Sequence, residues 1–427
     1  MLRAVRRALA LSAVLAVAAA APAPAQDVVG EQDLQPHLGA LHAIALESGG
    51  HRAAGTPGEA RTAEYAAAQL AEAGWTVART DVPFDYWEER SPPTLGAYRH
   101  GTDFVTVHYS GPGDLTARVR AIRGGGCRPR DFRRFPRGRI ALVAAYGCTF
   151  RRAAVLAQRA GARGMLVADF TAGPPVAATL GRPGLRLPVV SVRLPIAARL
   201  ARRRPRLRLR VDSITERRVT QNVVAELPGT EPNAVVMAGG HMDSTPRGPG
   251  MNDNGSGVAA LVAMGRQLAV RPRGRATLRF GFWAAHEPGM YGASRYARDL
   301  PREERRRVRA YLNLDMLGSP NGAPEVYTTT RAMRRLLARH LRGAGRTSAD
   351  APSDHTAFSR IGIPIGGIYT GSLEPKTRAQ RRRWGGTAGK ERDACYHRPC
   401  DDLDNVDLRM LSITATAARN ALEELAR

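Results

Sequence analysis

Five short segments in the second half of the chain each contain a side chain that binds metal ions well, and four of them are rich in glycine. Their sequences are GGHMDS, GPGMNDNGSG, AAHEPGMYG, NLDMLG and CYHRPCD. The candidate ligands in these segments are His241, Asp253, Glu287, Asp315 and His397. Two imidazoles and three carboxylates form a nitrogen and oxygen donor set that suits a pair of zinc-like ions. The sequence therefore predicts two metal ions.

A pair of metal ions suits hydrolysis. Two ions about 3.5–4 Å apart can share one water molecule and lower its pKa towards neutrality. Such a water attacks a polarised carbonyl, and a carboxylate base normally carries its proton to the leaving group. Asp253 could offer one oxygen to each ion, although Asn-Asp-Asn-Gly at 252–255 could also be a plain helix-capping turn. Asp243 is well placed to hold the His241 imidazole in its metal-binding tautomer.

The elements that would position these ligands alternate between strand and helix from residue 221 onwards. Apolar runs predict strands at 235–239, 276–284, 310–314 and 364–369, with helices at 257–269 and 291–298. This alternation predicts a mainly parallel sheet with helices on both faces, and ligands gather at the carboxyl ends of strands in such folds. Because His241, Glu287 and Asp315 each follow a predicted strand, we expect these three on one rim.

An inserted domain interrupts this pattern nearer the N-terminus. The chain first predicts helices at 33–45 and 59–73 and the start of a strand at 75–80. The composition then changes. The following segment has short β-rich runs at 104–109, 140–145, 165–168 and 187–192, which are separated by Gly, Pro and Arg stretches. One helix, at 151–160, lies among them. We therefore expect a metal-bearing domain at 26–92 and 213–427 and an accessory insert at 93–212.

The N-terminus has the features of a secretory signal peptide. Three arginines precede an apolar run at 8–20, and the small residues Ala23 and Ala25 indicate cleavage after residue 25. A membrane anchor is the alternative, but the run is short for a span, and no later stretch is long and apolar enough. We expect residues 1–25 to be removed and the mature protein to be secreted.

Four cysteines fit an exported protein. The two local pairings, Cys127 with Cys148 and Cys395 with Cys400, are the simplest of the three possible arrangements. A four-thiolate zinc site is the alternative, and the spacings do not suit one.

The formal net charge is +26, and all the basic residues except Lys376 and Lys390 are arginines. Nucleic-acid binding is one interpretation, and a GC-rich genome that encodes basic positions as arginine is the other. The arginines are spread along the chain, and the densest runs have structural explanations. Those at 206–210 alternate with leucine as in a half-buried strand, and those at 302–307 lie with two glutamates in a helical stretch. We expect a monomer with no specific nucleic-acid partner and at most weak adhesion to acidic surfaces.

The ordered motifs resemble those of the M28 family of zinc aminopeptidases, close to the bacterial secreted type. The most specific stretches are GGHMDS, GMNDNGSG, SDHTAF, GIPIGGIYTG, WGGTAG and CYHRPCDDLDNV. The similarity runs from about residue 221 to the C-terminus and includes the N-terminal helices. The insert resembles a protease-associated (PA) domain in GGGCRPRDF and IALVAAYGCTFRRAAVLAQRAGA, which contain Cys127 and Cys148. The implied fold is α/β, a mainly parallel mixed sheet flanked by helices (phosphorylase/hydrolase-like), with a small β-rich α+β insert.

The resemblance also implies roles for individual residues. Asp253 would bridge two zinc ions, and the other four ligands would divide between them in an order that the sequence leaves open. Tyr396 matches the position whose phenol stabilises the oxyanion, and a Cys395–Cys400 disulfide would pin its loop. Asp354 and His355, in SDH, would belong to the pocket wall without binding metal.

One residue departs from the family pattern. Two glutamates usually precede Gly-x-x-Gly, the first as the general base and the second as a ligand, but here the pair is His286 and Glu287. His286 could serve as a neutral base, because its reference pKa is near 6.5 and two zinc ions would repel its cation. Alternatively, it points elsewhere and turnover falls roughly 10²–10⁴-fold, or the protein only binds metal or peptide. In a smaller departure, Pro352 precedes SDH where related secreted enzymes often have arginine.

The sequence therefore predicts an exported aminopeptidase with two zinc ions that acts on peptides or proteins with a free N-terminus. The alternatives are a catalytically impaired or inactive M28-like protein that binds metal or peptide, and a glutaminyl-cyclase-like enzyme with one zinc. The presence of both His241 and His397 argues for two ions and against the cyclase.

Overall fold

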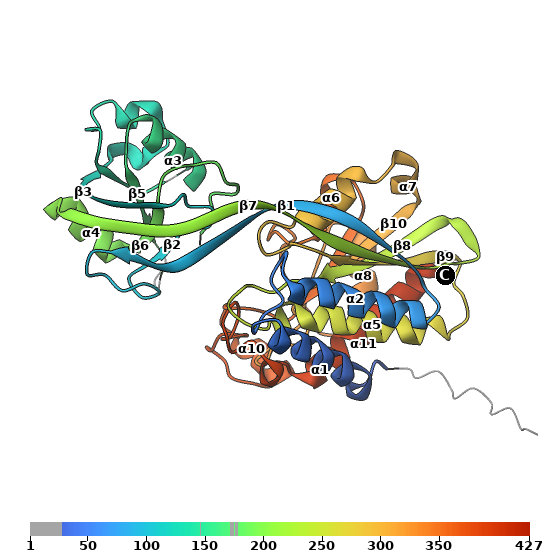
Figure 1. Cartoon of the computed structure of the whole chain (residues 1–427). Helices are drawn as coiled ribbons and strands as arrows, with labels where there is room; N and C mark the ends of the chain where they lie inside the picture. Colours follow the sequence, from blue (N-terminus) through green and yellow to red (C-terminus); the bar gives the residue numbers. More distant parts are fainter. Residues whose placement is uncertain (1–27, 146, 171–174, 176–177) are drawn as a thin grey trace, which may run out of the picture.

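The computed structural model describes residues 28–145, 147–170, 175 and 178–427. These form two lobes joined by a long two-stranded ribbon (Figure 1). The predicted signal peptide at 1–25 lies outside the described residues. Within the described part of the chain, no helix is both long and apolar enough to cross a membrane.

The ribbon consists of two long strands that run through both lobes. β1 (Thr76–Leu95) pairs antiparallel with β7 (Arg206–Leu227), and the pairing extends from Thr76 opposite Glu226 to Leu95 opposite Leu209. The half-buried strand predicted from the alternating arginines is therefore confirmed. The expected domain limits, 92/93 and 212/213, fall inside these two strands, so the backbone pairing continues through them. The division into domains remains a prediction.

The larger lobe contains the predicted, mainly parallel sheet. Its strand order is β12-β11-β13-β10-β8-β9-β7, and neighbours among β13, β10, β8 and β9 are parallel. The bounds are β8 (Glu231–His241), β9 (Ala276–Trp283), β10 (Val308–Leu314), β11 (Glu325–Thr328), β12 (Gly345–Arg346) and β13 (Ile365–Tyr369). The three strands predicted to carry ligands, β8, β9 and β10, are adjacent.

Helices cover both faces of this sheet, as predicted. Val236 and Ala238 of β8 pack into one core with α1, α2, α5 and α11, and Val235 and Met237 pack into another with α6 and α9. Alternate side chains of a strand point to opposite faces, so both faces must be covered. The bounds are α1 (Glu31–Glu47), α2 (Pro57–Glu72), α5 (Ser256–Ala269), α6 (Tyr291–Asp299), α7 (Arg302–Arg307), α8 (Arg331–His340), α9 (His355–Arg360), α10 (Arg378–Trp384) and α11 (Leu408–Ala426).

The smaller lobe continues the sheet from β7 through β3, β4, β5 and β6 to β2. Its elements are β2 (Phe104–Thr106), β3 (Gly113–Ala121), β4 (Ile140–Val143), α3 (Phe150–Arg159), β5 (Gly164–Asp169), β6 (Val189–Arg193) and α4 (Leu194–Arg203). The sequence predicts α3 but not α4. The expected Cys127–Cys148 disulfide forms between the segments that precede β4 and α3, with 5.7 Å between its Cα atoms.

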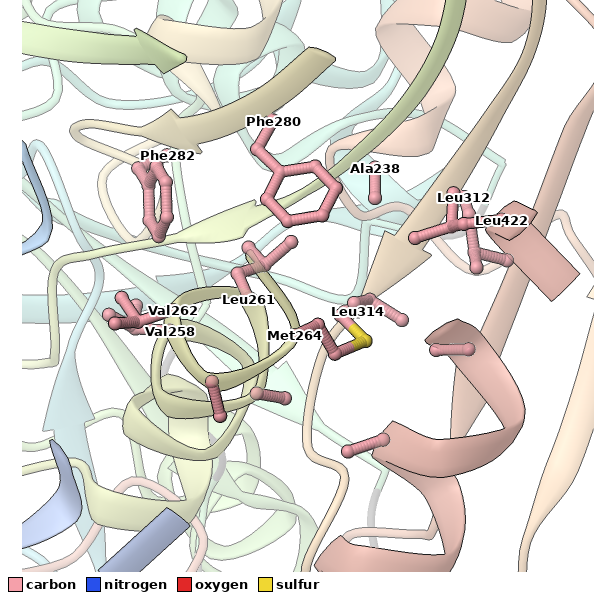
Figure 2. Close-up of a cluster of buried hydrophobic side chains, with 14 of the residues drawn as sticks. Ala238, Val258, Leu261, Val262, Met264, Phe280, Phe282, Leu312, Leu314 and Leu422 are labelled. Atoms are coloured by element: carbon pink, nitrogen blue, oxygen red, sulfur yellow. The ribbon is translucent and has the colours of Figure 1, made fainter. Parts of the chain in front are cut away.

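The centre of the larger core can be tested at Phe280. Figure 2 shows this β9 side chain above α5, near Leu261, and it also packs on Trp75 with 4.6 Å between ring centroids. We expect Phe280→Ala to lower the free energy of unfolding by about 3–5 kcal/mol, because the cavity cannot close around a rigid sheet. Val270→Ala, at a site that is 80% exposed, should change it by less than about 0.5 kcal/mol. Denaturant unfolding measures both, and equal small effects would contradict the assignment of this core.

Candidate metal centre

Three of the predicted ligands lie at one rim of the sheet, at the carboxyl ends of adjacent strands. His241 is the last residue of β8, Glu287 follows β9, and Asp315 follows β10. Since these strands are parallel neighbours, their ends bring the three side chains together. The rim expected from the strand-and-helix pattern is therefore present.

Asp253 lies between the two predicted histidine ligands. It belongs to the turn Met251–Gly255 that leads into α5, and its side chain is almost completely buried. Its Oδ1 is 3.2 Å from His241 Nε2, and its Oδ2 is 3.0 Å from His397 Nε2. One carboxylate thus presents a separate oxygen to each imidazole.

The remaining two carboxylates divide between the histidines. Asp315 Oδ1 lies 3.5 Å from His241 Nε2, and Glu287 Oε1 lies 3.3 Å from His397 Nε2. Donor atoms of His241, His286 and Asp315 form one compact group, and those of Asp253, Glu287 and His397 form another. By distance, His241 thus lies with Asp315, and His397 lies with Glu287.

The electrostatics of these groups favour a bound cation. Burial lowers the pKa of His397, but Glu287 and Asp253 raise it to about 11. Burial likewise lowers the pKa of His241, yet Asp315, Asp243 and Asp253 together raise it well above its ordinary value. Among the described residues, His241 Nε2, Glu287 Oε1 and Asp315 Oδ1 are buried without a hydrogen bond. Divalent cations would satisfy these atoms in place of protons, so the donor set fits metal ions.

Asp243 orients the site through both its backbone and its side chain. Its carbonyl oxygen lies 2.9 Å from His241 Nδ1, whereas its carboxylate is 3.7 Å from that nitrogen. The carboxylate instead accepts hydrogen bonds from the backbone N–H groups of His286 and Glu287, both at 2.9 Å. The bond that holds the imidazole therefore comes from the backbone, and the side chain fixes the loop that follows β9.

His286 stacks against His241 and faces a third carboxylate. The two imidazole rings lie 3.9 Å apart with an angle of 10° between their planes, and Asp354 Oδ1 lies 3.1 Å from His286 Nδ1. Burial and the charge of His241 lower the pKa of His286, but Asp354 and Asp315 raise it to about 9 in the protein alone. A metal ion bound to Asp315 would offset part of this increase in the pKa of His286. The sequence analysis expects a neutral His286 ring for the same reason.

The C-terminal loop is joined to the Asp253 turn. The predicted Cys395–Cys400 disulfide is present and encloses Tyr396 and His397. Directly after it, the Asp401 carboxylate accepts hydrogen bonds from the backbone N–H groups of residues 252 and 253, at 2.8 and 3.1 Å. This contact fixes the distance between the two segments that supply Asp253 and His397.

Tyr396 lies beside His397, one of the predicted ligands. Its ring stacks on His397 with 3.8 Å between centroids. Burial, together with the charges of Asp253, Glu287 and Asp315, raises the pKa of Tyr396 well above its ordinary range. The phenol is therefore a hydrogen-bond donor at physiological pH, as the expected oxyanion role requires.

Two buried ionisable residues from the N-terminal region, Arg52 and Glu59, also support the site, and the sequence analysis missed both. The Arg52 guanidinium donates hydrogen bonds to the backbone carbonyls of Met242, Pro249 and Gly250, which flank His241 and Asp253. Glu59, in α2, accepts a hydrogen bond from Ala285 N–H at 2.8 Å. Their partners are backbone groups about 190 to 230 residues away, so no spacing in the sequence could reveal them.

The insert also reaches the loop after β9. The Tyr109 hydroxyl donates to the carbonyl of Pro288 at 3.2 Å and lies 3.2 Å from the hydroxyl of Tyr291. The smaller lobe therefore contacts the segment that carries His286 and Glu287.

Arg52 provides a test of this support. Arg52→Met keeps the aliphatic stem but leaves three buried carbonyls unpaired, so we expect a loss of at least about 3 kcal/mol in unfolding free energy. The loops should also relax, and the zinc retained after dialysis should fall. Arg61→Met removes an exposed guanidinium whose partner is Glu47 and should cost less than about 0.5 kcal/mol. Calorimetry and elemental analysis measure the two effects, and wild-type behaviour of Arg52→Met would refute the assigned role.

Comparisons with known proteins agree with this geometry. The model of peptidase family M28 matches residues 222–422, and the PA domain model matches residues 113–200. An aminopeptidase of Pseudomonas aeruginosa is 34% identical over 88% of this chain and 77% of its own length. A probable lipoprotein aminopeptidase of Mycobacterium tuberculosis is 32% identical, covering 92% and 84%.

Among solved structures, the aminopeptidase from Aneurinibacillus sp. strain AM-1 has the same fold. Its TM-score is 0.77 at 23% identity, and the similarity covers 93% of this chain and 96% of that one. A zinc aminopeptidase from Bacillus subtilis gives a TM-score of 0.71, also at 23% identity, with 93% and 95% covered. The sequence relatives, the matched domain models and the shared fold establish that this chain belongs to peptidase family M28 and carries an inserted PA domain.

Proposed function

We propose that the protein is an exported aminopeptidase that uses two zinc ions to hydrolyse the N-terminal bond of peptides or proteins. The observation that carries the proposal is Asp253, whose two oxygens face two separate histidine and carboxylate groups. The names of the aminopeptidase relatives support the reaction. Two disulfides and the predicted signal peptide support export, since disulfides persist in oxidising compartments.

The residues would divide as follows. Asp253 would offer one oxygen to each ion, His241 and Asp315 would hold one ion, and Glu287 and His397 would hold the other. When bound, the ions would supply the positive charge that polarises the scissile carbonyl and acidifies a water molecule. The Tyr396 phenol donates a hydrogen bond to the oxyanion as negative charge develops on the carbonyl oxygen.

The preference for a free amino terminus rests on the aminopeptidase relatives. Asp243, Asp253, Glu287, Asp315 and Asp354 bring five carboxylates to the centre. Two divalent ions would offset four of these charges, and the buried Arg52 guanidinium, which interacts with Asp243 and Asp253, would offset the fifth. The net charge of the site therefore does not select the substrate.

His286 is placed in this scheme as the general base and not as a metal ligand. Its donor atom is close enough to those of His241 and Asp315 to join that group. However, the two rings lie nearly parallel at 3.9 Å. Stacked rings cannot both direct an in-plane lone pair at one ion about 2.1 Å from each nitrogen. His286 therefore takes the proton from the attacking water and gives it to the leaving amine.

The activity can be tested with a chromogenic leucyl substrate. We expect zinc-loaded wild type to hydrolyse it, His286→Ala to lose roughly 10²–10⁴-fold in kcat, and His286→Glu to remain active. If His286→Ala matches wild type, histidine is not the base. If wild type is inactive while His286→Glu is active, the protein is a catalytically impaired relative, as the alternative from sequence holds.

The number of ions can be tested separately from turnover. Elemental analysis of wild type should give about two zinc ions per chain, because each donor group can hold one. Asp253→Asn replaces the carboxylate that faces both histidines. The zinc content should therefore fall below about one ion per chain, and kcat should fall by at least about 10³-fold. Asp404→Asn, which changes an exposed carboxylate, should retain both ions. One ion in wild type would favour the cyclase-like alternative.

A further inference from the structure

Asp354 is a buried carboxylate that makes no hydrogen bond within the described part of the chain. Its side chain is 1% exposed, and both carboxylate oxygens are completely enclosed. Isolating a carboxylate from water costs several kcal/mol unless a donor compensates for it. The nearest candidate is His286 Nδ1, which lies 3.1 Å from Oδ1. This is within hydrogen-bonding distance, but the two atoms are not aligned for a hydrogen bond in this structure, so the ring must turn for the N–H to point at the carboxylate.

The place of Asp354 in the fold shows that the carboxylate is not needed locally. It is the residue before α9 (His355–Arg360), where an aspartate usually accepts a hydrogen bond from the first turn of the helix. Here its side chain makes no such bond. It also lies outside both compact donor groups. Helix capping and metal binding therefore leave the Asp354 side chain unexplained, and His286 remains as its partner.

The neighbouring residue fixes this segment against the metal centre. The Ser353 hydroxyl donates to Asp315 Oδ2 at 2.8 Å and accepts a hydrogen bond from Asn313 Nδ2 at 3.1 Å. Asn313 in turn donates to the Tyr327 hydroxyl at 2.9 Å. The backbone that carries Asp354 is thus anchored to a ligand of one ion, and the carboxylate is held at a fixed position relative to the His286 ring.

We propose that Asp354 is the positioning residue for His286, and that the His286–Asp354 pair replaces the single glutamate of the family pattern. The inference rests on the proposed function, in which His286 is the base. The Asp354 carboxylate accepts a hydrogen bond from the Nδ1–H group, which keeps its proton, and this bond holds the ring in one orientation. The lone pair is then on Nε2, which receives the proton of the attacking water and afterwards returns it to the leaving amine. No net proton is gained or lost by the pair.

A glutamate needs no such partner, because either of its oxygens can accept a proton. An imidazole has one lone pair in each neutral tautomer, and the wrong tautomer presents a donor where an acceptor is needed. The pairing of His286 with an otherwise unpartnered carboxylate therefore solves a problem that arises only when histidine occupies position 286.

A double-mutant cycle tests the pair. We expect Asp354→Asn to lower kcat about 10²–10⁴-fold with little change in KM or zinc content, since the ring loses its orientation but the ligands remain. In the His286→Glu background, the same change should lower kcat by less than roughly threefold. Asp350→Asn, which alters an exposed carboxylate in the preceding loop, should have no effect in either background.

The outcomes separate this proposal from the proposed function. Equal losses in both backgrounds, or loss of zinc in parallel with activity, would show that Asp354 has only a structural role. Inactivity of wild type with activity of His286→Glu would remove both the histidine base and its partner. Inactivity of both proteins with two zinc ions bound would refute the aminopeptidase itself.

A spectroscopic measurement reads the tautomer in the wild-type protein and does not need a folded Asp354 variant. In ¹⁵N-histidine NMR of the zinc-loaded wild-type protein, we expect the His286 signals, assigned by their absence in His286→Glu, to show a protonated Nδ1 and an unprotonated Nε2. An Nε2–H tautomer would overturn the proposal.

Discussion

Asp253 is the side chain on which the rest of the centre depends. Its two oxygens join an imidazole from the end of β8 to an imidazole from the C-terminal loop, 156 positions apart in the numbering of His241 and His397. The Arg52 guanidinium donates a hydrogen bond to the carbonyl of Gly250, three residues before Asp253. The Asp401 carboxylate accepts a hydrogen bond from the backbone N–H of Asp253. Burying so many polar groups is tolerable only when each has a partner, so the surrounding loops have one permitted arrangement. Because these segments pack so closely, some positions near the site have no space for a side chain. At Gly240, a Cβ would lie 2.5 Å from the Leu314 carbonyl oxygen.

The parts of this structure that the sequence predicts are those governed by periodicity and by strand ends. Alternation of strand and helix placed His241, Glu287 and Asp315 at one rim, because parallel neighbours end together. The 20-residue strand β1 was predicted only at its start, since it pairs with β7 alone, is half exposed and contains prolines that an edge strand tolerates. The supporting contacts of Arg52 and Asp401 could not be predicted, because backbone groups leave no mark on the residue pattern.

The backbone is unusual where the side chains must converge. Ala285, Met316 and His397 adopt positive φ angles of 50°, 55° and 58°. The first precedes His286, the second follows Asp315, and the third is a predicted ligand itself. Such conformations are unfavourable for residues with a side chain, and the surrounding contacts must maintain them. The chain thus departs from regular geometry at the places where strands give way to the site, while the core beneath remains regular.

The β1–β7 ribbon determines how the smaller lobe can move. A single connecting segment would allow rotation about its bonds. Two strands joined by backbone hydrogen bonds restrict that rotation, and such a ribbon bends less easily within the plane of the two strands than across it. Bending across that plane would shift Tyr109 against Pro288 and Tyr291, beside the loop that carries His286. The insert therefore contacts the loop that carries His286 through Tyr109, and a movement of the smaller lobe would be transmitted to that loop.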